Sequence, residues 1–331
     1  MKRIKLVALC LTIMLVFSGM AFSLEAQAEE EMLIATAFEP GHILMEMAEK
    51  FEELVMEETD QLDIEFSPGG AMGDESEIAE QTSVGAVEAQ LAGTLPIQIF
   101  IDEHYYIGTP YILQDYDHFR NLWEGEVGDQ IREDMKEDGD IVKLNAMYRG
   151  MRQTTSDVPF TNQEEFAEEN IALRLPEIPT WVEVWEAMGA DVTPVALDEL
   201  FTALQVGVAE ASEGDHTQIT EFSLYEVQDY LVMTDHHLET GYLSVNQQWF
   251  EGLDSELQEI IRDAAEEAAE WATEESKELE EESWEFLEEQ GMEIIEADTE
   301  SFREVGEPVA IEMFEERWPD FTYEEILEYA D

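Results

Sequence analysis

The stretch from Asp254 to Gly291 reads DSELQEIIRDAAEEAAEWATEESKELEEESWEFLEEQG and contains no proline and no glycine before its last residue. Ser255 and Gln258 fit a capping box, and Gly291 fits a helix stop. At 1.5 Å per residue one continuous helix is roughly 55 Å long. We therefore expect it to pack across two lobes rather than break near Lys277. Its expected apolar stripe consists of Leu257, Ile260, Ile261, Ala264, Ala268, Ala272, Leu279 and Phe286.

Short strand-like runs and helical runs alternate ahead of this helix. The alternation is typical of an α/β protein with a largely parallel sheet, or with two such sheets. Helices are expected at residues 42–56, 74–83 and 117–134. Strands are expected at residues 32–38, 62–67, 87–92, 141–147, 171–175, 191–195, 206–211, 230–233 and 242–245.

The composition is extremely acidic. The 331 residues include 15 Lys+Arg and 81 Asp+Glu, so the formal net charge is −66. Such a surface repels phosphates, which argues against a nucleic-acid partner. The apolar share of 44% and the aromatic share of 10% argue against a disordered acidic chain. Because the Debye length is only about 3 Å at 1 M salt, we expect adaptation to high salt; full stability and activity in salt-free buffer would contradict this.

The first 28 residues have the pattern of an export signal. Lys2, Arg3 and Lys5 precede an apolar run, and Ala26-Gln27-Ala28 supplies the small residues of a cleavage site. We therefore predict a signal peptide cleaved after Ala28, rather than a membrane anchor. The only cysteine, Cys10, lies inside this segment. The exported chain would thus rely on its core and not on disulfides.

Signatures of catalysis are absent from the sequence. There is no GxSxG, Walker A loop, GxGxxG after a strand or HExxH. None of the six histidines has metal-ligand spacing with a cysteine, and His236-His237 is expected on the surface or at a strand end. We therefore predict no enzyme and no metal or other cofactor, with an exported hydrolase as the alternative.

Arginines are informative because cations are rare in this chain. Arg174 lies in IALRLP (171–176), an apolar strand-like run. A buried guanidinium must be paired, and its fork matches a carboxylate. The residues alone leave two alternatives, an internal ion pair or a clamp for an anionic ligand. Arg152 lies in YRGMRQTTS (148–156) after a strand, where open α/β sheets bind ligands, unless it serves only surface solubility.

Several segments together resemble the DctP-type substrate-binding proteins of TRAP (tripartite ATP-independent periplasmic) transporters. The resemblance covers nearly all of the chain after the signal peptide, in collinear order. Residues 150–156 (GMRQTTS) are close to the family's G-x-R-Q-T-T-S, and residues 173–177 (LRLPE) resemble I-R-V-P-x. Further similar stretches are 70–75 (GAMGDE), 109–111 (TPY), 117–118 (DH), 188–194 and 199–208 (ELFTALQVGV).

This resemblance implies a two-lobed, type II periplasmic-binding-protein-like fold with the long helix spanning both lobes. Lobe I is expected to comprise residues 29–151 and about 240–275, and lobe II residues 152–239 and about 276–331. The implied function is periplasmic capture of a small carboxylate-containing solute and its delivery to a Na⁺-coupled membrane permease. We expect a monomer. A binding module that feeds a sensor kinase is the alternative use of the same fold.

The resemblance also implies roles for individual residues. The arginine matched by Arg174 holds the ligand carboxylate in the family, and the one matched by Arg152 supports it, which favours the ligand clamp. Further candidates for the cleft wall are Glu39, Glu177, Trp181 and Glu213.

Two positions depart from the family pattern and leave the solute open. Gly214 stands where the family often has an asparagine, and Leu197 stands where an aromatic residue is common. Carboxylates beside an arginine clamp favour a zwitterion, such as an ectoine-like solute, over a dicarboxylate. Tight binding of succinate or malate without binding of zwitterions would contradict that expectation.

Overall fold

The computed structural model describes residues 30–318 and 320–330, so the predicted signal peptide lies outside the described residues. The strands are β1 Glu30–Ala35, β2 Leu62–Ser67, β3 Ala89–Ala92, β4 Ile141–Lys143, β5 Met147–Ser156, β6 Ala172–Leu175, β7 Asp191–Pro194, β8 Ala211–Gly214, β9 Tyr230–Asn246 and β10 Glu293–Glu296. The α-helices are α2 Ile43–Glu58, α3 Glu75–Ser83, α4 Leu95–Phe100, α5 Tyr116–Glu124, α6 Glu126–Gly139, α7 Gln163–Glu169, α8 Pro179–Ala187, α9 Leu200–Gln205, α10 His216–Glu221, α11 Gln247–Gly252, α12 Ser255–Gln290, α13 Thr299–Arg317 and α14 Tyr323–Leu327.

The strands form one mixed sheet in the order β2-β1-β3-β9-β5-β8-β6-β7, and β4 and β10 both pair with β9. The prediction of parallel pairing is right for the outer strands, β1 with β2 and β3, and β6 with β7 and β8. It is wrong for the centre, where β9 runs antiparallel to β3, β4 and β5. The two short strands expected at 230–233 and 242–245 are the ends of this one 17-residue strand.

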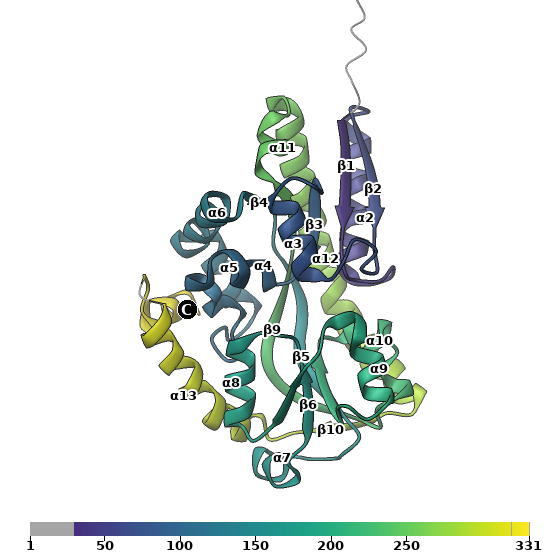
Figure 1. Cartoon of the computed structure of the whole chain (residues 1–331), viewed down its shortest axis with the longest axis vertical. Coiled ribbons are helices and arrows are strands. Elements are labelled where there is room, and N and C mark those ends of the chain that lie inside the picture. Colours follow the sequence, from purple (N-terminus) through teal and green to yellow (C-terminus); the bar gives the residue numbers. More distant parts are fainter. Residues whose placement is uncertain (1–29, 319, 331) are drawn as a thin grey trace, which may run out of the picture.

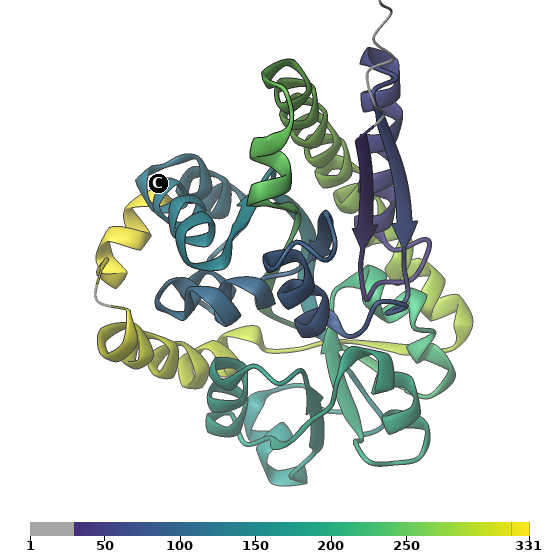
Figure 2. The ribbon, with the colours of Figure 1, turned by 45° about the horizontal axis from the view of Figure 1, so that its top comes forward.

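Strand β9 is shared by two lobes. Its C-terminal end pairs with β3 and β4, its N-terminal end pairs with β10, and β5 pairs with it along residues 230–241. Figures 1 and 2 show β1, β2 and α2 in one lobe and β6, β10 and α8 in the other, with α12 passing from one to the other. The predicted two-lobed α/β fold is thereby confirmed.

Helix α12 is continuous over 36 residues, as predicted. Its N-terminal half buries a stripe of small residues, including Ala265 and Ala268, in one core with α2, and Leu287 near its C-terminus joins the core of the other lobe. The predicted capping box is wrong, because the cap is Asp254, whose side chain accepts from the backbone N–H groups of Glu256 and Leu257. Gly291 ends the helix with a φ of 108°. Phe286, expected in the stripe, is 39% exposed.

Other boundaries differ for local reasons. The helix expected at 117–134 is broken at Gly125, which caps both α5 and α6. The strand expected at 206–211 begins only at Ala211, since Gly207 adopts a left-handed turn with a φ of 72°. No helix within residues 30–318 and 320–330 is long and apolar enough to cross a membrane.

Candidate functional site

A cavity of about 60 Å³ lies where the two lobes meet. Residues at or just beyond the carboxyl ends of β1, β3 and β6 line it, which is where open α/β sheets bind ligands. Helices α3, α8 and α10, the central strands β5 and β9, and Leu197 in the turn after β7 supply the rest. The lining residues are Phe38, Glu75, Gly93, Thr94, Leu95, Arg149, Arg152, Arg174, Pro176, Ile178, Trp181, Leu197, Gln218 and Glu239.

Arg174 is buried in this wall without an acidic partner. Its side chain belongs to β6, the residue is 1% exposed, and Nε donates to the carbonyl of Val195 at 2.9 Å. Nη2 has no hydrogen-bond partner, and no carboxylate of the described residues lies within ion-pair distance of the guanidinium. Burial lowers the pKa of Arg174 to about 10. Because a buried, unpaired charge is costly, this guanidinium is well suited to an anion supplied from outside the protein.

Arg152 lies in the same wall in a different electrostatic situation. Its guanidinium donates to the carboxylate of Glu213 through Nε and Nη2, and to Oε2 of Glu239 at 2.5 Å through Nη1. The guanidinium also lies 4.9 Å from the centre of the Trp181 ring. The protein itself therefore satisfies most of the hydrogen-bonding capacity of Arg152.

Arg149 extends this ion-pair network. Its Nη2 donates to Oδ2 of Asp215 at 2.7 Å, and its Nη1 lies 3.6 Å from Oε1 of Glu239. Burial opposes ionisation of Glu213, but the opposing charge of Arg152 and a hydrogen bond from His236 outweigh it and lower the pKa of Glu213 to about 2. Burial also opposes ionisation of Asp215, and Arg149 holds the pKa of that carboxyl below its usual range. The neighbouring guanidinium groups thus favour the ionised forms of Glu213 and Asp215 despite their burial.

Removing the carboxylate of Glu213 tests this network through pH. We expect Glu213→Gln to lower the free energy of unfolding by about 3–5 kcal/mol near pH 7, because Arg152 loses a buried partner. Glu213 has its usual pKa of about 4.3 in the unfolded chain and a lower one when folded, so its contribution is complete above about pH 5 and fades as the pH falls toward 2. Thermal unfolding of both proteins at molar salt from pH 7 to 2 measures the difference. A gap that stays constant or widens toward pH 2 would contradict this.

Glu75 places a carboxylate opposite the arginines. It is the first residue of α3, partly buried, and accepts the backbone N–H of Gly93 at 2.9 Å. Burial raises its pKa, and likewise that of Glu239. The cavity therefore combines the free guanidinium of Arg174 with two carboxylates that can accept hydrogen bonds from a ligand.

The structure brings some of the predicted wall residues together and not others. Trp181 lines the cavity, and its Nε1 donates to the carbonyl of Gly108 at 2.5 Å. Glu213 is fully buried beside Arg152 and does not line the cavity. Glu39 and Glu177 are exposed and are not among the lining residues. The carboxylates that do face the site, Glu75 and Glu239, were not predicted.

Of the two departures from the family pattern, Leu197 lines this cavity and Gly214 lies behind a lining residue. Leu197 is a lining residue. A Cβ atom on Gly214 would come within 2.6 Å of the Nε2 atom of Gln218, so Gln218 occupies the space that a side chain at position 214 would need. Gln218 lines the cavity, and its Nε2 donates to the carbonyl of Glu213 at 3.0 Å.

His236 and His237 correct the prediction of a surface or strand-end position. Both are buried in β9, at 1% and 2% exposure. Their rings pack against Trp185 and Trp181, with ring centres 4.8 and 5.0 Å apart respectively. Burial lowers the pKa of both histidines, and Nε2 of His236 lies 3.3 Å from Oε2 of Glu213. Within the described ranges, no group of three or more His, Cys, Asp or Glu residues could hold a metal ion.

Two α/β lobes around a cavity with an unpaired arginine define a solute-binding protein. The family model of the bacterial extracellular solute-binding proteins, family 7 (DctP), matches residues 34–317. The chain therefore belongs to this family, whose members bind solutes and are not enzymes.

Individual relatives agree with this assignment. A solute-binding protein of Roseobacter denitrificans is 29% identical over 70% of this chain and 72% of its own length. The sialic acid-binding periplasmic protein SiaP of Vibrio cholerae is 27% identical over 77% of this chain and 79% of its own. A crystal structure of the same R. denitrificans protein, a TRAP periplasmic solute-binding protein with bound L-galactonate, has a TM-score of 0.83 at 25% identity, covering 92% of this chain and 100% of that one.

Proposed function

We propose that this protein is the periplasmic solute-binding subunit of a TRAP transporter and that it holds a small monocarboxylate by its carboxylate on Arg174. The observation that carries the proposal is the buried guanidinium of Arg174, which has no acidic partner among the described residues. Arg152 lies in the same cavity wall, and its charge is neutralised by Glu213 and Glu239. The exported chain, cleaved after Ala28, would act as a monomer and deliver its solute to a Na⁺-coupled membrane permease.

A sugar acid is the ligand class that the lining chemistry favours. Glu75, Thr94 and Gln218 offer hydrogen-bonding groups to ligand hydroxyls on the wall shared with Arg174. Among the relatives, one binds L-galactonate and another is named for sialic acid, both polyhydroxy carboxylates. A second carboxylate on the ligand would meet Glu75 and Glu239, which disfavours dicarboxylates. A zwitterion is the second candidate, because Glu75 could accept its ammonium group.

The mechanism is opening and closing of the two lobes. The cavity of about 60 Å³ is too small for a sugar acid, so the lobes must move apart to admit one. Binding then stabilises the closed arrangement because ligand contacts come from both lobes. The continuous strands β5 and β9 and helix α12 connect the lobes and would bend during this movement.

A thermal-shift panel tests the ligand class. At molar salt, L-galactonate and related sugar acids should raise the melting temperature, by the equivalent of about 2.7 kcal/mol at 100 times Kd, whereas succinate should not. Glu75→Gln should weaken sugar-acid binding several-fold and reduce the discrimination against succinate, since it removes a repulsive carboxylate. Stabilisation by succinate and not by any sugar acid or zwitterion would overturn the proposed class.

The protein that this chain binds distinguishes a role in transport from a role in sensing. Co-purification with a small and a large membrane subunit supports delivery to a permease, whereas capture by a sensor kinase supports the alternative. The salt adaptation that the charge of −66 predicts is tested in the same preparation, by comparing stability and binding with and without molar salt.

A further inference from the structure

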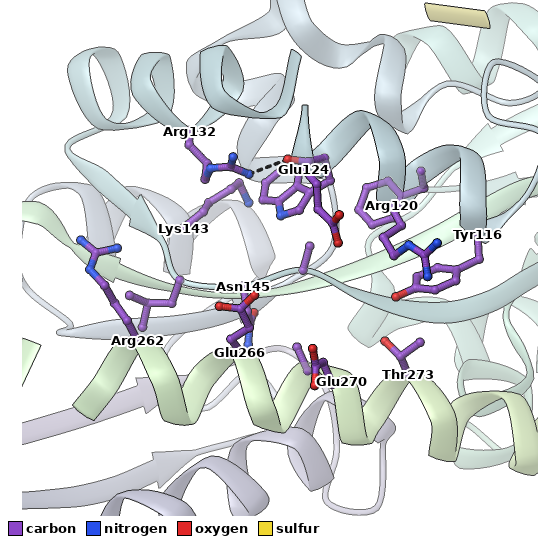
Figure 3. A pocket seen from close by; sticks show the side chains of 15 residues that line it. Tyr116, Arg120, Glu124, Arg132, Lys143, Asn145, Arg262, Glu266, Glu270 and Thr273 are labelled. Carbon is purple, nitrogen blue, oxygen red and sulfur yellow. Dashed lines mark hydrogen bonds between the residues drawn. The ribbon is translucent and has the colours of Figure 1, made fainter. Parts of the chain in front are cut away.

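A second cavity, of about 370 Å³, lies in the lobe that contains β1 and shares no lining residue with the Arg174 cavity. Helix α5 forms one wall and α12 the other, and the connection from β4 to β5 forms the floor (Figure 3). Four of the chain's 15 Lys+Arg residues line it, in a protein of net charge −66. These four cations take no part in the proposed function.

Lys143 places a buried ammonium group at this floor. It is the last residue of β4 and is 3% exposed. Its Nζ lies 3.7 Å from the centre of the Tyr242 ring and has no hydrogen-bond partner within the described ranges. Burial lowers the pKa of Lys143 to about 7. The ring face offsets part of the cost of burying the charge, but all three donors of the ammonium lack an acceptor.

The other cations of the cavity differ in how far they are neutralised. Arg132 donates to Asp129 at 2.7 Å, and Arg120 lies 3.3 Å from Asp117. Arg262 is exposed and packs over the ring of Phe250 at 4.6 Å, without an ion pair in the described part of the chain. Lys143 is thus the one buried cation of this cavity whose charge is left without a carboxylate.

The rim of the cavity carries the opposite charge. Glu266 and Glu270 project from α12, and Glu124 comes from α5 (Figure 3). All three are exposed, and none forms an ion pair within residues 30–318 and 320–330. The aromatic residues Phe119 and Trp123 complete the α5 wall. The cavity therefore has a cationic floor, an apolar wall and an anionic rim.

We propose that this cavity is a second ligand site, which binds a small zwitterion with its carboxylate toward Lys143 and its ammonium toward Glu266 and Glu270. The carboxylate would give the ammonium of Lys143 the acceptor that the protein does not supply. The apolar body of the ligand would lie against the aromatic wall. A dianion is disfavoured by the rim, and a simple cation is disfavoured by the floor.

The test is calorimetric titration of L-phenylalanine into the full exported chain at molar salt. We expect binding to the wild type and to Arg174→Met alike, which separates this site from the main cleft. Lys143→Met keeps the length and the packing on Tyr242, and should weaken binding at least tenfold while leaving the melting temperature of the free protein unchanged or higher. Phenethylamine, which lacks the carboxylate, should not bind.

Each opposing result overturns the proposal. It is wrong if 10 mM L-phenylalanine gives no binding to the wild type, if Lys143→Met binds as well as the wild type, or if Arg174→Met abolishes binding. Should Lys143→Met fail to fold, the surface variant Glu266→Gln/Glu270→Gln decides. A loss of about fivefold or more for L-phenylalanine, with no loss for 3-phenylpropionate, supports the zwitterion site, and an unchanged affinity for L-phenylalanine overturns it.

Discussion

Arg174→Met should lower the affinity for the solute by a factor of about 100 to 1000, with no loss of stability in the free protein. Truncating one partner of a buried charge pair costs about 3–4 kcal/mol, which corresponds to that change in Kd. The free protein keeps its stability because no internal carboxylate loses its partner when Arg174 is replaced. Removing this buried charge leaves the melting temperature equal or higher. Calorimetric titration gives the affinity, and thermal unfolding gives the stability.

Arg174→Lys is the matched control for this prediction. It keeps the charge but loses the planar fork that bonds a carboxylate through two parallel hydrogen bonds. We expect an intermediate loss of affinity, near tenfold. If Arg174→Met unfolds without ligand, the arginine stabilises the fold and is not primarily a ligand clamp.

Arg152→Met is expected to do the opposite and destabilise the free protein by about 3–5 kcal/mol. The substitution leaves the carboxylates of Glu213 and Glu239 buried without the guanidinium of Arg152. Only Glu239 then has another arginine nearby, since Arg149 lies 3.6 Å from it. An uncompensated buried charge has that cost. The melting temperature at molar salt should fall by roughly 10 °C.

The double variant Arg152→Met/Glu213→Leu is the control, because it removes Arg152 together with one of its two carboxylate partners and leaves Glu239 beside Arg149. It should recover a large part of the lost stability, since a buried ion pair replaced by apolar groups is often neutral. If Arg152→Met leaves the free protein stable but abolishes binding, Arg152 contacts the solute directly and the ion-pair network is not its main role.

The sequence allowed prediction of those elements whose pattern is local. Helix α12 has uninterrupted periodicity from Asp254 to Gly291, and its continuity and end were predicted correctly. The sequence predicted two short strands in place of β9 because the middle of this strand is polar. Its buried polar residues there are Thr234, His236, His237 and Glu239. Their partners, such as Glu213 for His236 and Arg152 for Glu239, come from distant segments. Contacts with partners from distant segments leave no periodic pattern in the sequence, so they could not be predicted from it.

Site residues also divide into those with a local sequence signal and those whose role depends on distant partners. Arg174 was conspicuous because a charge inside an apolar strand needs an explanation. Glu75 and Glu239 could not be singled out among 81 acidic residues, although they face the cavity. The signal for Glu75 was present only in its context, at the first position of a helix that follows a glycine-rich turn. Lys143 had no sequence signal, since its burial follows from the packing of Tyr242 beneath it.

The central claim is that an unpaired arginine between two lobes holds the carboxylate of a solute. Calorimetric titration of L-galactonate, run at molar salt on the wild type and on Arg174→Met, tests it most directly. The account predicts saturable binding to the wild type and a loss of at least about 100-fold in the variant, whose unfolding temperature is not lowered. Equal affinity in the two proteins would contradict it.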